Sequence, residues 1–371
     1  MPNIVALIYS SEFNESNYGE LCKSRPDYML PFGGRYRIID FALSNLTNHD
    51  ISSVILCADR MLRSTIDHIG NGKSWELNRR NGGLLINSPG TSRYSEIETY
   101  YDTIRYFEDH NSEYVYIKNP MYINKEDITD AYEKMKDENL DCLIFSTKTV
   151  DKDGNYLNRK IISSDENGKP QSVGINLGIS DEIDLFLGSF MIKTEVFLRV
   201  LRLAMERDSK MSLLNAIFTL GGDLNIDFYR EDKGFEIISD TNSFFDANLR
   251  LLDREVFNEL FYQDGLVYTK SKDEPSTSYT KESQVRNSLI ANGAIIKGQV
   301  ENSIIFRGVT IGKGAVVKNS VIFQDTDIGD GAILNFVITD KRTKISKDTR
   351  LFGNRSHPFV TNKNEVLEKG N

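Results

Sequence analysis

A short internal repeat in the C-terminal part of the chain restricts the fold more than any other feature. The segment VENSIIFRGVTIGKGA (Val300 to Ala315) matches VKNSVIFQDTDIGDGA (Val317 to Ala332) at nine of sixteen positions, with an offset of 17 residues. A third, partial copy begins at Val285. Within a copy, aliphatic residues such as Ile305 and Ile311 stand six apart, and there is no helical period. The repeat therefore indicates a solenoid.

In a solenoid with this period, each flat side takes about six residues and three sides close one coil. The aliphatic side chains stack inside, and Gly, Asn and Asp make the turns because they tolerate positive φ. This pattern predicts a left-handed parallel β-helix over residues 284–371. Solenoids of this kind often associate with one another, so we expect an oligomer.

The N-terminal part predicts a different fold class, an α/β domain over residues 1–261. Four apolar runs read as buried strands, and amphipathic segments between them read as helices. This alternation predicts a Rossmann-like, parallel, doubly wound sheet, whose ligands bind beyond the carboxyl ends of the strands. Asn124 is the expected cap of one helix, and residues 246–261 are expected to form another. A polar linker over residues 262–283 joins this domain to the solenoid.

Composition excludes several classes of partner. The chain has 371 residues and a net charge of −9, which disfavours nucleic acid and anionic membranes as partners. It has no apolar run long enough to cross a bilayer and no signal segment, so we expect a cytoplasmic protein. The three cysteines and four histidines have no metal-ligand spacing. A bound zinc ion is therefore not expected.

The segment PFGGRYRIIDFALSN (Pro31 to Asn45), together with the solenoid repeat, resembles the bacterial glucose-1-phosphate adenylyltransferases (ADP-glucose pyrophosphorylases). The resemblance covers essentially the whole chain. It implies a nucleotidyltransferase domain of the GT-A-like kind followed by a left-handed β-helix. In that family the reaction joins ATP and glucose 1-phosphate and releases pyrophosphate, with Mg²⁺ as the cofactor.

The residues that the family uses for this chemistry are changed here. The glycine-rich phosphate loop after the first strand is replaced by a segment that contains Glu12, and Asp27 stands where the family has a lysine. Both carboxylates would repel phosphate. Asn119 and Ser243 stand where the family has two metal-binding aspartates. We therefore expect no catalytic residues and no metal site in this chain, and no cofactor bound by the chain alone.

This set of changes resembles the non-catalytic GlgD-type subunit of glycogen biosynthesis. The resemblance implies a regulatory subunit that assembles with a catalytic glucose-1-phosphate adenylyltransferase in a heterotetramer. In that assembly the catalytic partner would use Mg²⁺. Arg25 and Arg37 match arginines that hold anionic regulators in the family, so a small anionic effector is a further expected partner. The pair Arg35 and Arg37 with Asp40 fits an effector site or a structural ion pair equally well.

Two other functions are compatible with parts of the sequence. One is an active sugar-phosphate nucleotidyltransferase with an atypical donor loop, against which the four changed positions count. The other is a hexapeptide-repeat acyltransferase, which needs a histidine inside the coils as a general base. The one histidine in the C-terminal part, His357, is expected beyond the last repeat. This second alternative is rejected.

Overall fold

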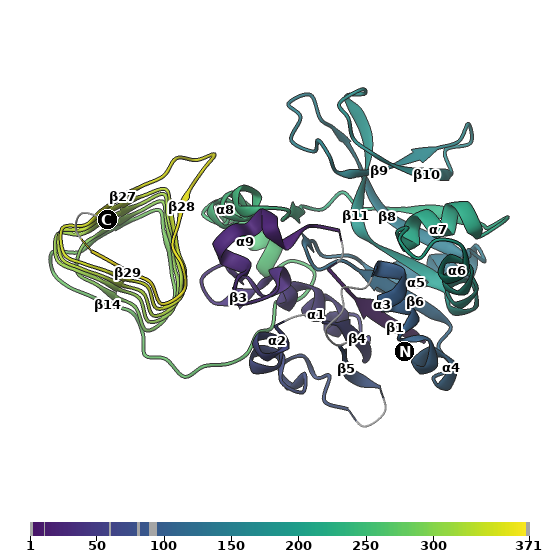
Figure 1. Ribbon diagram of the computed structural model, residues 1–371, viewed down its shortest axis with the longest axis horizontal. Helices are drawn as coiled ribbons and strands as arrows, with labels where there is room; N and C mark the ends of the chain where they lie inside the picture. The colour runs from purple at the N-terminus through teal and green to yellow at the C-terminus, as the bar shows by residue number, and fades with distance from the viewer. Residues whose placement is uncertain (1–2, 11, 59–60, 80–81, 89–94, 369–371) are drawn as a thin grey trace. The chain divides into compact units, whose positions relative to one another are not determined.

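The computed structural model describes residues 3–10, 12–58, 61–79, 82–88 and 95–368 (Figure 1). The chain forms two compact units, which are treated separately below. The α/β unit consists of Met1–Glu12, Ala42–Leu62 and Ile69–Phe235. The solenoid unit consists of Phe13–Phe41, Arg63–His68 and Glu236–Asn371. The segment with the PFGG motif thus belongs to the same unit as the repeats.

The α/β unit is built on one nine-stranded mixed sheet. Its main strand order is β10-β9-β11-β6-β1-β4-β5, and β8 pairs with both β11 and β12. β1, β4 and β6 are parallel, as expected from their apolar sequences, and β5, which the sequence did not predict, pairs parallel with β4. The strands are β1 Ile4–Ile8, β4 Ser53–Cys57, β5 Gly83–Asn87, β6 Tyr114–Lys118, β8 Cys142–Val150, β9 Lys160–Ser164, β10 Pro170–Ile175, β11 Glu182–Lys193 and β12 Ile226–Arg230, with the short β7 Tyr122–Ile123 beside them.

The sheet was predicted to be parallel, but it is mixed: antiparallel pairs occur among β6, β8, β9, β10 and β11. β11 runs antiparallel between β6 and β8, so β8 does not pair with β6. The β9–β10 hairpin, which the sequence reasoning did not detect, supplies the reversal that brings β11 back antiparallel. An antiparallel neighbour needs only such a hairpin, whereas a parallel one needs a crossover connection. The Rossmann-like α/β class is confirmed, with a mixed sheet in place of an all-parallel one.

Helices α3 to α7 complete the α/β unit, and α6 packs against α7 (Figure 1). The cap of α5 differs from the prediction: Asp127 accepts the N–H of Asp130, while Asn124 lies in a buried polar cluster described below. A hydrophobic core cluster of this unit lies between the sheet and helices that include α6 and α7. The helices of this unit are α3 Glu96–Tyr101, α4 Ile104–Asp109, α5 Ile128–Asp137, α6 Thr194–Arg207 and α7 Leu213–Leu220, with the 3₁₀ helix η3 Lys73–Trp75. Helix α1 Ile38–Asn48 begins in the solenoid unit and ends in the α/β unit, and nearly all of α2 Leu62–Ile69 belongs to the solenoid unit.

The repeats form a parallel β-helix whose triangular outline is seen in Figure 1. The offset of 17 residues is confirmed, because Ile311 pairs with Ile328, which pairs with Ile345. These stacked aliphatic residues make the solenoid core. Its three sheets are made of β14 Ser278–Tyr279, β17 Ile295–Ile296, β20 Thr310–Ile311, β23 Asp327–Ile328, β26 Lys344–Ile345 and β29 Val366–Leu367; β15 Gln284–Arg286, β18 Gln299–Glu301, β21 Val316–Lys318, β24 Ile333–Asn335 and β27 Arg350–Phe352; and β16 Leu289–Ile290, β19 Ile304–Ile305, β22 Val321–Ile322, β25 Val337–Thr339 and β28 Phe359–Val360.

One prediction for the solenoid is wrong in detail. His357 does not follow the last repeat but lies in an excursion between β27 and β28, where it bridges to Asn354. The excursion lengthens the last coil, since Ile338 pairs with Val360. His357 is exposed and does not lie inside a coil, so the acyltransferase alternative stays rejected.

The rest of the solenoid unit combines helices, short strands and irregular segments. The helix expected over residues 246–261 is two helices, because Asp253 accepts the N–H of Glu255 and starts a new helix. Gly33 has a positive φ, and its N–H donates to the Asn248 side chain at 3.1 Å. The elements are η1 Glu15–Cys22, η2 Asp27–Met29, β2 Pro31–Phe32, β3 Tyr36–Arg37, β13 Glu236–Ile237, α8 Thr241–Arg250 and α9 Arg254–Phe261.

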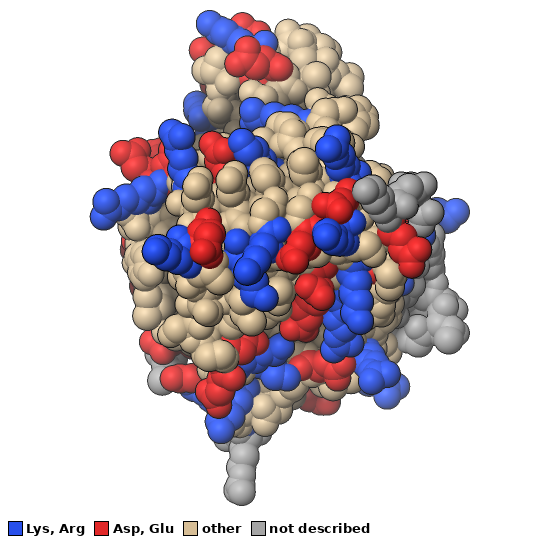
Figure 2. Space-filling view, turned by 90° about the vertical axis from the view of Figure 1, so that its left-hand side faces the viewer, with Lys and Arg blue, Asp and Glu red and all other residues tan. Residues whose placement is uncertain are grey.

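Positive and negative side chains are mixed on one face of the molecule. Lys and Arg side chains are interspersed with Asp and Glu on the face shown in Figure 2, without a wide zone of one sign. Such a mixed face lacks the basic stripe that nucleic acid selects. Over the ranges that the structure describes, no helix combines the length and the apolarity that crossing a membrane requires.

Candidate functional site

The carboxyl end of β6 carries a buried lysine that is paired inside the α/β unit. Lys118 is only 4% exposed, and its Nζ lies 2.9 Å from Glu126 Oε1 and 2.5 Å from Asn124 Oδ1. Glu126 also accepts hydrogen bonds from the hydroxyls of Ser189 and Tyr116. Burial lowers the pKa of the Lys118 ammonium, and the Glu126 carboxylate opposes that shift. The end of β6 is therefore occupied by an internal ion pair.

Asn119 follows Lys118 and is also used internally. Its backbone N–H donates to Gly188 O at 2.8 Å, and its side-chain oxygen accepts the N–H of Met121 at 3.0 Å. An amide oxygen held in a turn, next to a buried ammonium group, does not suit Mg²⁺, which needs carboxylates and open positions. No three His, Cys, Asp or Glu side chains within the described ranges gather as a metal site would require. The residues here do not fit the metal that the family uses.

Glu12 lies past the end of β1 and has two partners in the same unit. The Tyr122 hydroxyl donates to Glu12 Oε1 at 2.7 Å, and Lys160 Nζ lies 3.4 Å from Glu12 Oε2. The Glu12 and Lys160 side chains are 11% and 19% exposed. The carboxylate that the sequence analysis expected to repel phosphate is thus held by a phenol and an ammonium group.

The two other changed positions lie in the solenoid unit and have structural contacts. Ser243 forms a reciprocal capping box with Asp240 at the start of α8. Asp27 is buried, and its side chain accepts the N–H of Tyr28 at 2.7 Å in η2. A serine hydroxyl that caps a helix and an aspartate that stabilises a turn are local structural roles.

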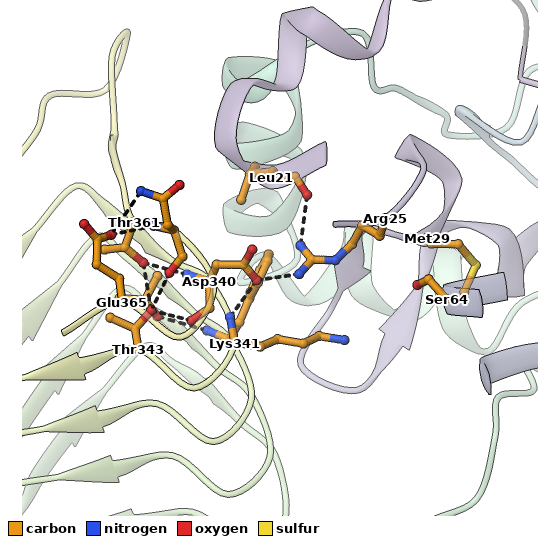
Figure 3. A network of polar contacts seen from close by, with 12 residues as sticks. Leu21, Arg25, Met29, Ser64, Asp340, Lys341, Thr343, Thr361 and Glu365 are labelled. Carbon is orange, nitrogen blue, oxygen red and sulfur yellow. Dashed lines mark hydrogen bonds and ion pairs between the residues drawn. The ribbon is translucent and has the colours of Figure 1, made fainter. Parts of the chain in front are cut away.

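The clearest charged network of the solenoid unit joins Arg25 to Asp340 (Figure 3). Arg25 Nη2 lies 2.6 Å from Asp340 Oδ1, and Nη1 donates to Leu21 O at 3.0 Å. Both side chains of the pair are almost completely buried. The Asp340 backbone is fixed in turn by Thr361, which accepts its N–H, and by Thr343, which donates to its carbonyl. Arg25 is therefore occupied by a partner within the chain.

Two further cations lie near this pair. Arg37 Nη1 donates to Met29 O at 2.9 Å, and Ser64 Oγ lies 3.5 Å from the same nitrogen. The Lys341 side chain extends away from the Asp340 carboxylate in Figure 3. Burial, and then the charges of Arg37 and Arg25, lower the pKa of Lys341 to about 6. Because this pKa lies below 7, Lys341 is largely neutral at pH 7, and a small anion bound beside it would favour its protonated form.

The expected group of Arg35, Arg37 and Asp40 is only partly brought together. Asp40 Oδ2 accepts the backbone N–H of Arg37, and Asp40 Oδ1 lies 2.6 Å from His68 Nε2. The Arg37 guanidinium and the Asp40 carboxylate thus serve different partners. Burial lowers the pKa of His68, which Asp40 opposes. His68 was not identified as a site residue from the sequence.

Arg35 instead lines a cavity of about 250 Å³ in the solenoid unit. Arg307 forms another part of its wall and donates from Nη2 to Arg35 O at 3.2 Å. Glu274 lies 3.6 Å from Arg307 Nε and partly neutralises it. The remaining walls are the glycine turn, three aromatic residues, a lysine and the first coil of the solenoid: Gly33, Gly34, Tyr36, Phe257, Tyr262, Lys272, Leu289, Ile290, Ala291 and Asn292.

The repeat itself contains a signal for these residues. At the offset of 17, Asp340 stands where Phe306 and Phe323 stand in the two preceding coils. Both phenylalanines are completely buried, so an aspartate at their position needs a buried cation as its partner. By the same offset, Lys341 stands where Arg307 stands two coils earlier. The same position of the repeat thus places Arg307 at the Arg35 cavity and Lys341 beside Arg37.

These features define a class of protein. A Rossmann-like α/β sheet is combined here with a parallel β-helix of hexapeptide repeats. The family described as "GlmU-like, C-terminal hexapeptide" matches residues 275–358. The chain belongs to the family of GlgD glycogen biosynthesis proteins and glucose-1-phosphate adenylyltransferases.

The relatives that support this assignment cover most of the chain. The glycogen biosynthesis protein GlgD of Bacillus subtilis is 34% identical over 91% of this chain and 89% of its own length. GlgD of Geobacillus stearothermophilus is 34% identical over 80% of this chain and 78% of its own length. The glucose-1-phosphate adenylyltransferase of Fusobacterium nucleatum is 30% identical over 80% of both chains.

Proposed function

We propose that this chain is a regulatory subunit of glucose-1-phosphate adenylyltransferase in glycogen biosynthesis. It has no adenylyl-transfer activity alone and acts by assembling with a catalytic homologue in a heterotetramer. The observation that carries this proposal is the buried Lys118–Glu126 pair at the end of β6. Adenylyl transfer needs Mg²⁺ and donors for phosphate at this edge of the sheet, and a closed internal ion pair supplies neither.

The proposal extends to a small anionic effector. In the cluster of Arg25, Arg37 and Lys341, Arg25 is held most closely by a buried carboxylate. Arg37, and Lys341 in its protonated form, are therefore the groups that would bind an anion. Arg35 and Lys272 line the separate cavity. An anion that binds one assembly state better than another shifts the equilibrium between them, and this coupling is the physical basis of regulation by such a subunit.

A reconstitution experiment tests the assembly and the source of the chemistry together. The purified chain, given ATP, glucose 1-phosphate and Mg²⁺, is expected to form no ADP-glucose. Mixed with the catalytic homologue, it is expected to co-elute on size exclusion and to change the rate or the apparent substrate affinity.

The decisive control uses a catalytic homologue whose metal-binding aspartate is replaced by alanine. The mixture of that inactive partner with this chain is expected to stay inactive, because neither chain then holds Mg²⁺. Product formation in this mixture would instead show that the present chain is an active nucleotidyltransferase with an atypical donor loop. Failure to co-elute with either partner would refute the assembly.

A further inference from the structure

The contacts of Glu12 indicate more than the loss of a phosphate loop. Its carboxylate is the negative partner of Lys160 and the acceptor of the Tyr122 hydroxyl. A cation together with a phenol donor is a combination that binds phosphate oxygens, through a charge-assisted contact and a hydrogen bond. In this structure both groups face an anion that belongs to the chain itself.

The surroundings hold these groups in place. The Tyr122 ring lies so close to Gly188 that a Cβ at Gly188 would be 2.3 Å from it, so only glycine allows this position of the ring. Phe186, whose ring centroid lies 6.1 Å from that of Tyr122, is also 6.0 Å from Lys160 Nζ. Tyr122 and Phe186 are both buried. Lys160 and Tyr122 therefore converge on Glu12 from a packed wall.

The location is the edge of the sheet where ligands of such folds bind. Glu12 follows β1, and Tyr122 follows β6, so both come after the carboxyl ends of adjacent parallel strands. Lys160 begins β9. Three segments that are distant in sequence thus contribute to one charged site in the α/β unit.

We propose that Glu12 is an intramolecular substitute for a bound phosphate group. Lys160 and Tyr122 form a latent site for a phosphate monoester, and the Glu12 carboxylate closes this site. The wild-type chain then does not bind phosphate at this place, because the anion would meet the Glu12 carboxylate. Replacing that carboxylate with a neutral group opens the site. This inference concerns the isolated chain and does not depend on assembly with a partner.

The test uses Glu12→Gln, which keeps the size of the side chain and an acceptor for the Tyr122 hydroxyl. Titration of the full-length variant with inorganic phosphate by calorimetry at pH 7.5 is expected to show at least tenfold tighter binding than the wild type. The double variant Glu12→Gln/Lys160→Met is expected to return to the wild-type level. A second variant, Tyr122→Phe in the Glu12→Gln background, is expected to weaken the new binding several-fold.

The matched control is Glu108→Gln, which frees Arg202 from a surface ion pair outside any such site. It is expected to leave phosphate binding unchanged. Equal phosphate affinity of the wild type and Glu12→Gln would overturn the proposal, as would new binding that persists without Lys160. Circular dichroism and the urea midpoint of each variant show whether the fold is intact, and Glu12→Ala provides a second way to remove the carboxylate if Glu12→Gln is damaged.

A parallel titration distinguishes two sources of the phosphate group. If glucose 1-phosphate binds Glu12→Gln more tightly than inorganic phosphate does, the latent site includes contacts to the sugar. If the two bind equally, the site recognises the phosphate dianion alone. Both results support the proposal. The reconstitution experiment above is independent of them, so either proposal can fail while the other stands.

Discussion

The Arg25 guanidinium and the Asp340 carboxylate lie 315 residues apart in the sequence and 2.6 Å apart in the structure. The pair joins the segment before the PFGG motif to a coil of the solenoid, and both residues belong to the same compact unit. The other Asp340 oxygen, Oδ2, is buried without a hydrogen-bond partner among the described residues. Asp340 is thus tightly bound on one side only, and Arg25 is its principal counter-charge.

Replacing Asp340 by asparagine is expected to destabilise the solenoid unit by about 3 kcal/mol. The reason is that Arg25 would stay buried without a counter-charge. The measurement is the free energy of unfolding from urea denaturation. The control Asp325→Asn, in an exposed ion pair on the same solenoid, is expected to cost about 0.5 kcal/mol or less. An equal effect of both variants would contradict the importance of the buried pair.

Lys341 is expected to make stability depend on pH. Its pKa of about 6 in the folded chain lies below the unfolded value of 10.5, so between these values the unfolded state binds the additional proton. Stability contributed by this group therefore rises as pH rises from about 6 toward 10. Lys341→Met is expected to remove that slope and to stabilise the chain by about 1–2 kcal/mol at pH 7.

Urea midpoints of the wild type and of Lys341→Met at pH 6 and pH 9 check this prediction. Lys347→Met, an exposed lysine of the same coil region, is the matched control and is expected to keep the wild-type pH dependence. An anion bound beside Lys341 favours its charged form, so it is expected to raise the pKa and to bind more tightly at pH 6 than at pH 8. A slope that survives in Lys341→Met would contradict the assignment.

The two groups of cations in the solenoid unit can be separated by mutation. Arg35→Gln is expected to reduce binding of a small anion in the cavity, and Arg37→Gln to reduce binding in the cluster with Lys341, each about tenfold. The effector response of the reconstituted complex is the measurement. Arg342→Gln, on an exposed arginine, serves as the control. If neither Arg35→Gln nor Arg37→Gln changes the response, the effector does not bind at either place.

The ion pair at the end of β6 is expected to be structural. Lys118→Met leaves the Glu126 carboxylate buried with only hydroxyl and amide donors, which is expected to destabilise the α/β unit by about 3 kcal/mol. Lys118→Met/Glu126→Gln removes both charges and is expected to recover part of this loss. Lys193→Met breaks a more exposed pair with Asp141 and is expected to cost less than about 1 kcal/mol. Unfolding free energies of the wild type, Lys118→Met, Glu126→Gln and the double variant close the double-mutant cycle, and simple additivity would contradict the coupling.

The α/β unit shows where reading from the sequence fails. The apolar runs predicted β1, β4 and β6 correctly, since a strand buried on both faces is a local property. β11 was missed, although it runs through the centre of the sheet. Strand order depends on how the β9–β10 hairpin reverses the chain, and apolar periodicity does not encode this. The same limit explains Asn124, whose predicted capping role was taken by Asp127 because Lys118 and Glu126 bind its side chain.

The sequence alone determined the solenoid, because each coil packs on its neighbour at a fixed offset and the stack of Ile311, Ile328 and Ile345 repeats visibly along the chain. From the family resemblance it also predicted that the catalytic positions are changed. Only the tertiary structure decided the partners of these charged residues: that Arg25 pairs with Asp340, that Lys118 pairs with Glu126, and that Glu12 meets Lys160. Ion pairs depend on distances between residues far apart in sequence, and those distances exist only once the chain has folded.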